Sequence, residues 1–417
     1  MLEKLDYINW HELKHAYGSA EDVPSQIRGL LASDSQTREK ALWALSGNIF
    51  HQGTRYQATP YAIPFLYELI ESDKTPDRDK IILFLVSLAL GYEEEYLPEG
   101  ISIINFRNEY KEAEENMTSA QREECAKYGY NPQAILDGYY QVKAGIPILL
   151  ELINDADKKI SRAAIYALAW FPETASVTIS RIKSKLNTFS EQEDISIAIL
   201  AIGLLVRSSK QAFDSSELEK YLTSQSSLIR ISAAIGLAQN PLSDKILTEL
   251  INGILSNKEF QYLENIPFNE GRLAGYASLV LSKYGASEKE KVIPTLCEVL
   301  KSVNAYQSLD VTAGLLGILN GKRTRLIKDT DVNDLDDLDR TALHTILHYG
   351  GWELGNADYV NFSELLQYAG VPDTREKLKN YLADQSKAAY SLGKEENPPR
   401  TVLKATMNFI RRLLGLH

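Results

Sequence analysis

The side chains that could bind a ligand or do chemistry are concentrated in the string from His51 to Tyr56. It offers an imidazole, an amide, a hydroxyl, a guanidinium and a phenol, and Gly53 would let a ligand approach the backbone closely. We expect this string to cap helix ends and to tie neighbouring helices together through hydrogen bonds. The alternatives are that it is a rim loop that binds a ligand or a partner, or that it is catalytic. The candidate binding residues are His51, Gln52, Thr54, Arg55 and Tyr56.

A second group of candidates lies in residues 92–140, which combine glutamates with tyrosines. From Glu93 to Lys127 the sequence has ten Glu against four Lys or Arg. Tyrosine supplies amphipathic contact area and glutamate supplies a negative field, so the segment is suited to binding a basic protein. The alternative is a solvated helical excursion packed on the flank of the fold. The candidate binding residues here are Glu93, Glu94, Glu95, Tyr96 and Tyr110.

Other patterns that suggest catalytic or metal sites are incomplete. His344 and His348 are four residues apart, as in zinc hydrolases, but Thr345 stands where those enzymes have glutamate, and no third ligand is evident. The sequence has no Gly-rich phosphate loop, no Gly-x-Ser-x-Gly string and no Cys-x-x-Cys pair, and Cys125 and Cys297 are its only cysteines. We therefore expect no metal ion and no cofactor.

The acidic run from Asp329 to Asp339 has some features of a calcium-binding loop. In that register Asp334 occupies the position of the required glycine, and Arg340 occupies that of the bidentate glutamate. We expect instead a solvated turn in which Asp336 or Asp337 caps the following helix.

Composition and charge restrict the class of protein. The chain has 417 residues, 44% of them apolar and 24% charged, which is ordinary for a globular protein with two or three domains. Its 56 Asp and Glu outnumber its 45 Lys and Arg, whereas proteins that bind duplexes usually carry a basic surplus. The longest apolar stretches, 81–90 and 195–206, are too short to span a membrane. We expect a cytoplasmic protein that does not bind nucleic acid.

The elements that position the candidate residues are predicted to be helices, because apolar residues recur at helical spacing and no alternating runs indicate β-hairpins. Three segments, 62–72, 145–155 and 292–302, share the pattern Ile-Pro-x-Leu-x-Glu-(Leu/Val)-(Ile/Leu). Proline suits the first turn of a helix, so each copy is expected to start a helix near its proline, and a second helix rich in small residues follows. The leucines predicted to be buried are Leu66, Leu69, Leu149, Leu152 and Leu296.

These helix pairs resemble the HEAT-repeat family, whose second helix follows a turn Asp and reads Val-Arg-x-x-Ala-x-x-Ala-Leu. The matching residues are Asp34, Arg38, Ala41, Ala44 and Leu45 in one copy and Ile229, Arg230, Ala233, Gly236 and Leu237 in another. The string His-Gln-Gly-Thr-x-Tyr, followed by Ala-x-Pro-Phe-Leu, is similar to a block of bacterial HEAT-repeat proteins of unassigned role. The resemblance implies an all-α fold, a curved right-handed α-solenoid of about eight HEAT-like helix pairs with an insertion and a C-terminal capping helix.

The expected solenoid has five parts. They are N-terminal pairs (1–91), the acidic insertion (92–140), central pairs (141–320), an Asp-rich connector with C-terminal pairs (321–384), and a linker with a basic amphipathic helix (385–417). The last helix, at 400–416, is expected to cap the open end of the stack, and the alternatives are contact with a partner or with a membrane surface.

A solenoid without an obligatory pocket suits protein recognition. We expect a non-enzymatic scaffold or adaptor that binds a protein partner, one with a basic patch, through its concave face or the acidic insertion. The family resemblance suggests an inhibitor or immunity-type protein as one form of this function. The alternative is a HEAT-fold enzyme, similar to a DNA glycosylase or a lyase, with a site near His51, Arg55 and Tyr56.

Overall fold

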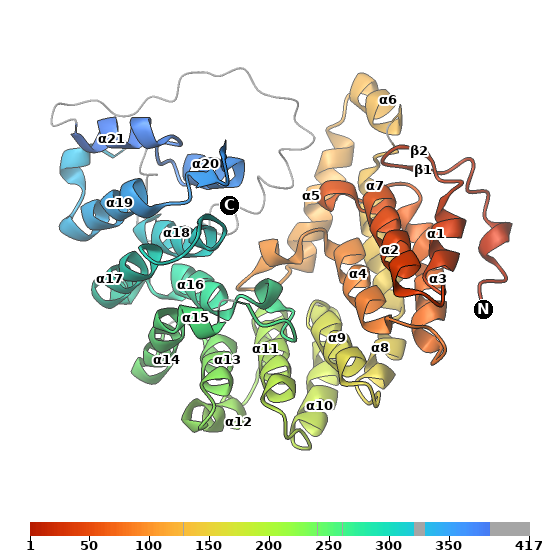
Figure 1. Cartoon of the computed structure of the whole chain (residues 1–417), viewed down its shortest axis with the longest axis horizontal. Coiled ribbons are helices and arrows are strands. Elements are labelled where there is room, and N and C mark those ends of the chain that lie inside the picture. Colours follow the sequence, from red (N-terminus) through yellow and green to blue (C-terminus); the bar gives the residue numbers. More distant parts are fainter. Residues whose placement is uncertain (128, 240, 261, 321–329, 384–417) are drawn as a thin grey trace. The chain divides into compact units, whose positions relative to one another are not determined.

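The computed structural model describes residues 1–127, 129–239, 241–260, 262–320 and 330–383. These residues form an all-α fold in which many helices pack side by side (Figure 1). The expected linker at 385–399 and the basic helix at 400–416 lie outside the described residues, as does Asp329.

The chain forms two compact units. The first consists of Met1–Glu93, Gly100–Phe189 and Leu204–Ala212, and the second of Glu94–Glu99, Ser190–Gly203 and the residues from Phe213 onward. The elements of the first unit are β1 (Lys14–His15), β2 (Gly18–Ser19), α1 (Val23–Gly29), α2 (Ser35–Ile49), η2 (His51–Gly53), α3 (Thr59–Glu71), α4 (Arg78–Leu90), α5 (Ile103–Glu115), α6 (Ser119–Lys127), α7 (Pro132–Ala144), α8 (Ile146–Leu152), α9 (Lys158–Leu168), η4 (Pro172–Thr174) and α10 (Ala175–Leu186).

Helix α11 (Gln192–Ser209) contributes residues to both units. The further elements of the second unit are α12 (Ser216–Glu219), α13 (Ser227–Leu237), α14 (Asp244–Leu255), α15 (Asn257–Phe260), η6 (Phe268–Gly271), α16 (Leu273–Tyr284), α17 (Lys289–Leu300), α18 (Ala305–Asn320), η9 (Val332–Asp334), α19 (Asp337–Tyr349), β3 (Glu353–Leu354), β4 (Ala357–Asp358), α20 (Val360–Tyr368) and α21 (Arg375–Ala383).

The helices of the second unit form two layers. Helices α13, α16, α18 and α20 pack one against the next, and α14, α17, α19 and α21 do the same beside them (Figure 1). Because helices adjacent in the sequence largely alternate between the layers, a helix inside the stack such as α17 packs both against its own layer, on α14 and α19, and against the opposite layer, on α18. This arrangement is the one that stacked helix pairs produce.

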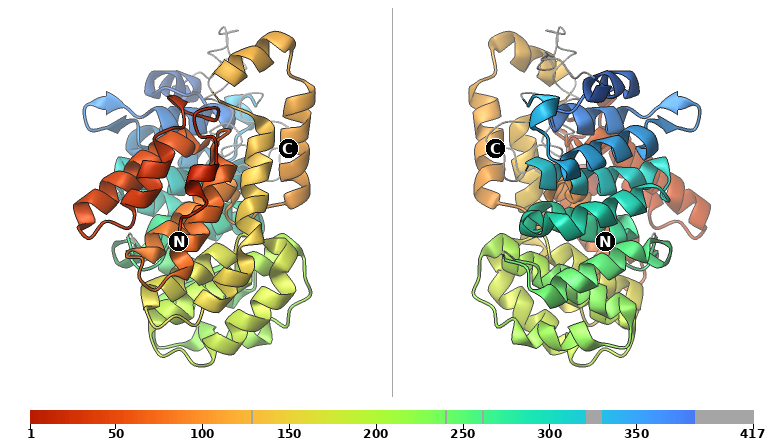
Figure 2. Two further views of the ribbon diagram at one scale, coloured as in Figure 1. Left: turned by 90° about the vertical axis from the view of Figure 1, so that its right-hand side faces the viewer. Right: turned by 90° about the vertical axis from the view of Figure 1, so that its left-hand side faces the viewer.

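The first unit contains an additional helix within its stack. Helix α7 packs against both α3 and α4, and its residues Ile135, Tyr139 and Val142 are buried. The expectation that 92–140 is an insertion outside the array is therefore wrong for α7, which belongs to the core. The remaining part, α5 and α6, lies on the outside of α7, with α6 at the outer end of the unit (Figure 2).

The predicted core leucines are confirmed with one exception. Leu66, Leu69, Leu149 and Leu296 have no exposed surface. Leu152 is half-exposed, because the buried stripe of the short helix α8 runs through Ile146 and Leu149 to Ile153, at spacings of three and four residues.

The repeated prolines occupy two different kinds of position. Pro147 lies in the first turn of α8, as predicted, but Pro64 and Pro294 lie inside α3 and α17. Helix α3 begins earlier, at Thr59, because a second proline, Pro60, already provides the favourable first-turn residue. An interior proline leaves one backbone hydrogen bond unmade, which the burial of neighbours such as Leu66 and Leu69 outweighs.

Two β-hairpins occur that the sequence pattern did not indicate. Strand β1 pairs with β2 and β3 pairs with β4, each strand being two residues long and each pair antiparallel. A strand of two residues is too short to produce a recognisable alternation of apolar and polar residues. In both units the hairpin is followed by a helix, α1 in the first and α20 in the second.

Arginine side chains tie successive helix pairs of the first unit together. Arg38 of α2 donates hydrogen bonds to the carbonyl oxygens of Ala32 and Ser33 at 3.0 Å each, and its Nε lies 2.6 Å from an Asp77 carboxylate oxygen in the turn before α4. The next residue, Arg78, bonds the Ile70 carbonyl at the end of α3. We call the contacts of Arg38 with Asp77 and of Arg78 with Asp155 the arginine ladder.

The next step of the ladder joins α4 to the turn between α8 and α9. The Nη2 atom of Arg78 lies 3.0 Å from a carboxylate oxygen of Asp155, and the two side chains are only 12% and 15% exposed. In the second unit, Arg230 repeats the geometry of Arg38. It bonds the carbonyls of Ser224 and Gln225, again six and five residues upstream, and pairs with Glu249 at 3.1 Å.

Breaking the ladder at Asp155 is expected to cost about 3 kcal/mol of unfolding free energy, because Arg78 would remain largely buried without its carboxylate. The variant Asp155→Asn retains an oxygen for the Asp157 amide, 2.9 Å away, so it removes mainly the charge. Urea unfolding followed by circular dichroism measures the loss, and adding Arg78→Met should restore part of it. The exposed pair Lys80–Glu39 is the control, since Glu39→Ala should cost about 0.5 kcal/mol or less.

The stabilisation that α7 gains from its hydrogen bonds to Glu173 should depend on pH. Glu173 accepts hydrogen bonds from Tyr139 at 2.7 Å and Lys143 at 2.8 Å, both on α7. Burial raises the pKa of Glu173, but these bonds lower it by more, so the net pKa lies below the ordinary value. A lowered carboxylate pKa stabilises the fold above the unfolded pKa of about 4.3, and the effect is lost as the pH falls through the folded pKa.

Glu173→Gln should therefore be less stable than the natural chain by roughly 1–2 kcal/mol at pH 7 and nearly equal to it at about pH 3. Urea unfolding at a series of pH values measures this convergence. A stability difference that stays constant over the whole series would contradict the assignment.

Candidate functional site

The predicted loop at 51–56 forms a tight turn at the end of α2. Gln52 and Gly53 both have left-handed backbones, with φ of 50° and 75°, and the Thr54 amide donates to the His51 carbonyl at 3.1 Å. A side chain at position 53 would collide with the ring of Tyr92, whose Cε2 would lie 2.7 Å from the added carbon. Glycine is required here by conformation and by space.

The surface of this turn is aromatic. The Nδ1 atom of His51 lies 3.1 Å from the Tyr17 hydroxyl, and the two rings meet edge to face at 5.2 Å. Tyr17 is 70% exposed, Gln52 is also exposed, and Thr54 is half-exposed. The hydrogen bond between His51 and Tyr17, which lies in the β1–β2 hairpin, therefore helps to order the turn.

Arg55 lies in the interior. It is 2% exposed, and its Nη1 donates to the Gly53 carbonyl at 2.5 Å. Gly91, with φ of 91°, admits the guanidinium, because a side chain there would lie 2.6 Å from Nη1. The buried Nε and Nη2 atoms of Arg55 have no hydrogen-bond partner among the described residues. Arg55 thus fills space in the core and keeps two donor atoms unsatisfied.

Tyr56 is likewise part of the scaffold. Its backbone pairs with Tyr130 in an antiparallel bridge, and its amide donates to the Thr59 hydroxyl, which in turn donates to the Ile49 carbonyl. Burial, with a smaller contribution from Tyr17, raises the pKa of Tyr56 to about 12. The phenol therefore stays protonated at neutral pH.

The five acidic and tyrosine candidates do not form one exposed surface. In the first unit, Glu93 accepts hydrogen bonds from Ser87 at 3.5 Å and Tyr166 at 2.9 Å, and Tyr110 packs on Phe106 with ring centroids 5.0 Å apart. The other three belong to the second unit, where one is half-buried and two are buried: Glu94, Glu95 and Tyr96.

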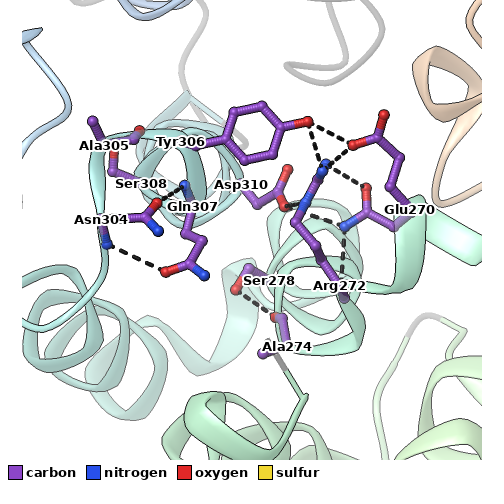
Figure 3. A network of polar contacts seen from close by, with 11 residues as sticks. Glu270, Arg272, Ala274, Ser278, Asn304, Ala305, Tyr306, Gln307, Ser308 and Asp310 are labelled. Carbon is purple, nitrogen blue, oxygen red and sulfur yellow. Dashed lines mark hydrogen bonds and ion pairs between the residues drawn. The ribbon is translucent and has the colours of Figure 1, made fainter. Parts of the chain in front are cut away.

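A polar cluster that sequence reasoning missed lies in the second unit (Figure 3). Arg272 is at its centre. Its Nε donates to Asp310 at 3.0 Å, and its Nη1 donates to the Tyr306 hydroxyl at 3.0 Å and to Glu270. Tyr306 donates to Glu270 at 2.6 Å, and the guanidinium lies 4.9 Å from the centre of the Tyr306 ring. The side-chain amide of Asn269 also donates a hydrogen bond to Asp310, with 3.2 Å between the nitrogen and the carboxylate oxygen.

Electrostatics hold this cluster in one charge state. Burial lowers the pKa of Arg272, but the Asp310 carboxylate and its neighbours raise it above the ordinary value overall. Burial and the hydrogen bond to Glu270 raise the pKa of Tyr306 to about 12. The adjoining hollow, lined in part by Gly275 and Ser278, has about 20 Å³, room for one water molecule. The cluster is a fixed ion-pair network.

One sequence signal could have revealed the Arg272 cluster. The string Phe268-Asn-Glu-Gly-Arg272 parallels Phe50-His-Gln-Gly-Thr-Arg55, with one residue fewer between glycine and arginine. In both turns the residue before glycine is left-handed, with φ of 50° at Gln52 and 51° at Glu270. The chain thus uses a Phe-x-x-Gly turn twice to direct an arginine into the protein.

The two other patterns noted in the sequence are the histidine pair of α19 and the acidic run before that helix. His344 and His348 are both exposed on α19, and no three His, Cys, Asp or Glu side chains of the described residues are grouped to hold a metal ion. Asp336 caps α19 as predicted, accepting from the Asp339 amide at 2.9 Å. Arg340, at the position where a calcium-binding loop has glutamate, donates a hydrogen bond to the Val332 carbonyl at 2.6 Å and so stabilises the turn before α19.

Comparison with known proteins adds no assignment. No family model matches the chain, and no curated protein matches it. In the described parts of the chain, no helix has the length and apolar character needed to cross a bilayer.

Arg55 is expected to contribute volume rather than charge. Arg55→Met, which fills the same space without the unsatisfied donors, should change the unfolding free energy by about 1 kcal/mol or less. Arg55→Ala should cost about 2–4 kcal/mol, because it leaves a cavity. Thermal and urea unfolding of the two variants measure the difference. Equal losses in both would show that an anionic group compensates the guanidinium.

Proposed function

We propose that the chain is a HEAT-like α-solenoid that acts as a non-enzymatic protein-binding scaffold. The arginine ladder and the two-layer packing of the second unit support the repeat architecture. Arg38 and Arg230, the positions that match the HEAT signature, have the same contacts relative to their own helices. The number of repeats and the curvature of the array are part of this proposal.

The observation that carries the binding function is the exposed helical arm formed by α5 and α6. None of the described side chains of α6 is buried, and Phe106 is the only buried side chain of α5. A helix of nine residues, none of whose described side chains is buried, has little intrinsic stability in water, and its exposed surface is available for contact with another molecule.

The charge of the arm suits a basic protein. Residues 103–127 contain six glutamates and four basic residues, and Arg122 lies 3.8 Å from Glu114. Glu112, Glu115 and Glu123 are exposed. Their negative field would speed association with a basic surface more than it would raise the final affinity, and salt would screen it. The inhibitor or immunity role is a specific form of this proposal.

Replacing the three exposed glutamates of the arm by glutamine should weaken binding to the natural partner. The expected effect is a severalfold slower association at low salt that shrinks at high salt, with an unchanged melting temperature. The partner is first identified by affinity capture from the native host and mass spectrometry. Association rates are then measured with the purified partner at two salt concentrations. The variant is Glu112→Gln, Glu115→Gln and Glu123→Gln.

A matched control removes the same charge from other exposed positions of the first unit. Glu3→Gln, Glu12→Gln and Glu71→Gln change the net charge equally but leave the arm intact. Equal slowing in the control and the arm variant would contradict recognition by the arm. Deleting 93–130 is unsuitable for this test, because Leu97, Ile101 and Phe106 are buried.

A further inference from the structure

One edge of the Arg55 guanidinium has no partner in the chain. The side chain is 2% exposed, and its Nη1 donates to the Gly53 carbonyl at 2.5 Å. The buried Nε and Nη2 atoms have no hydrogen-bond partner among the described residues. Their N–H bonds run parallel along one edge of the planar group. Together they form the fork with which arginine holds the two oxygens of a carboxylate.

The backbone next to Arg55 is shaped to admit a guanidinium. Gly91 has φ of 91°, and a side chain at this position would lie 2.6 Å from Nη1 and 3.6 Å from Cζ of Arg55. Burying a charge without a partner costs free energy, and an apolar residue of similar length would fill the space without that cost. A ligand for the open fork would account for the presence of arginine here.

The second Phe-x-x-Gly turn shows which groups such a fork binds in this protein. At Arg272, Nε donates to a carboxylate oxygen of Asp310 at 3.0 Å (Figure 3). Nη2 of Arg272 donates to the side-chain oxygen of Asn269 at 3.4 Å. The edge that faces oxygen atoms at Arg272 is thus the same edge that is open at Arg55.

We propose that the Nε–Nη2 edge of Arg55 is a binding site for a small free carboxylate. The ligand takes the position beside Arg55 that the Asp310 carboxylate has beside Arg272, and both of its oxygens accept from the fork. The site lies inside the first unit, and it does not depend on the proposed binding of a protein by the arm.

A phenol lies close to the proposed site. Burial raises the pKa of the Tyr130 phenol most, and the positive charge of Arg55 acts in the opposite direction. The two groups are therefore close enough to interact. Because the phenol stays protonated at neutral pH, it offers a further hydrogen-bond donor near the guanidinium.

The fork is closed to solvent in the structure, since both of its nitrogen atoms are buried. The η2 turn, whose Gly53 carbonyl is bonded to Nη1, has its next outward residue, Gln52, exposed. A ligand enters only when this turn or a neighbouring side chain moves. We therefore expect a ligand of few atoms, such as formate or acetate, and association slower than diffusion allows.

Thermal unfolding of the full chain in formate, at constant ionic strength with chloride as the replaced anion, tests the site. Above the dissociation constant, the melting temperature of the natural chain should rise by about 2 °C for each tenfold increase in formate. Arg55→Met should abolish this rise. Without formate this variant should be nearly as stable as the natural chain, because the guanidinium is then uncompensated.

Two further variants separate the fork from the charge. Arg55→Lys keeps a cation but has no fork, so it should need about ten times more formate for the same rise. Arg181→Met is the matched control, because it removes an exposed guanidinium of the same unit and should respond to formate as the natural chain does. In protein labelled with ¹⁵N-arginine, formate should shift the Nε resonance that is missing from Arg55→Lys.

Four results would each overturn the proposal. They are a natural chain that responds to formate and acetate no more than to chloride, an equal response in Arg55→Met, a stronger response to inorganic phosphate than to formate, and a response that appears only in Glu109→Gln. Glu109 also acts on the Tyr130 phenol. The last result would therefore show that a carboxylate of the chain itself fills the fork.

Discussion

The contact on which the stacking of this protein depends is the hydrogen-bonded pairing of a buried arginine with a carboxylate from the neighbouring helix pair. At the end of a helix the last carbonyl groups carry partial negative charge and have no partner within the helix. Arg38 bonds the Ala32 and Ser33 carbonyls in the turn between α1 and α2 and also binds Asp77. Arg78, the residue after Asp77, bonds the Ile70 carbonyl at the end of α3 and pairs with Asp155. Each arginine therefore fixes both the turn within one pair and the position of the next pair.

The faces that this stacking does not use are the ones available for function. A helix inside the stack has neighbours in its own layer and in the other layer, so its exposed surface is narrow. Helices α2 and α6 both have exposed faces, and these expose different chemistry: Trp43 on α2 and glutamates such as Glu123 on α6. A charged helix favours a fast and salt-sensitive encounter with a partner, which is why the proposed binding function rests on the arm.

The all-α fold could be predicted from the sequence because helical periodicity and the repeated arginine are local signals. Asp34 and Arg38 lie four residues apart: Asp34 caps α2, and Arg38 bonds two carbonyls of the turn just before that helix. The place of α7 in the core could not be predicted, because its burial depends on α3 and α4, which lie far away in the sequence. The burial of Arg55 could not be predicted for the same reason: Gly91, which makes room for the guanidinium, is 36 residues away in the chain.

The two Phe-x-x-Gly turns show why residue type alone does not identify a site. Both direct an arginine inward, but Arg272 meets the carboxylates of Asp310 and Glu270, while among the described residues Arg55 has a hydrogen bond to the Gly53 carbonyl alone. A buried cation with carboxylates in place is held in one geometry, and removing either partner leaves an uncompensated charge. A buried cation without them costs free energy that apolar packing must offset. The same local motif thus places Arg272 in an ion-pair network in one unit and leaves Arg55 without a carboxylate partner in the other. The difference depends on Asp310, which lies far from the motif in the sequence.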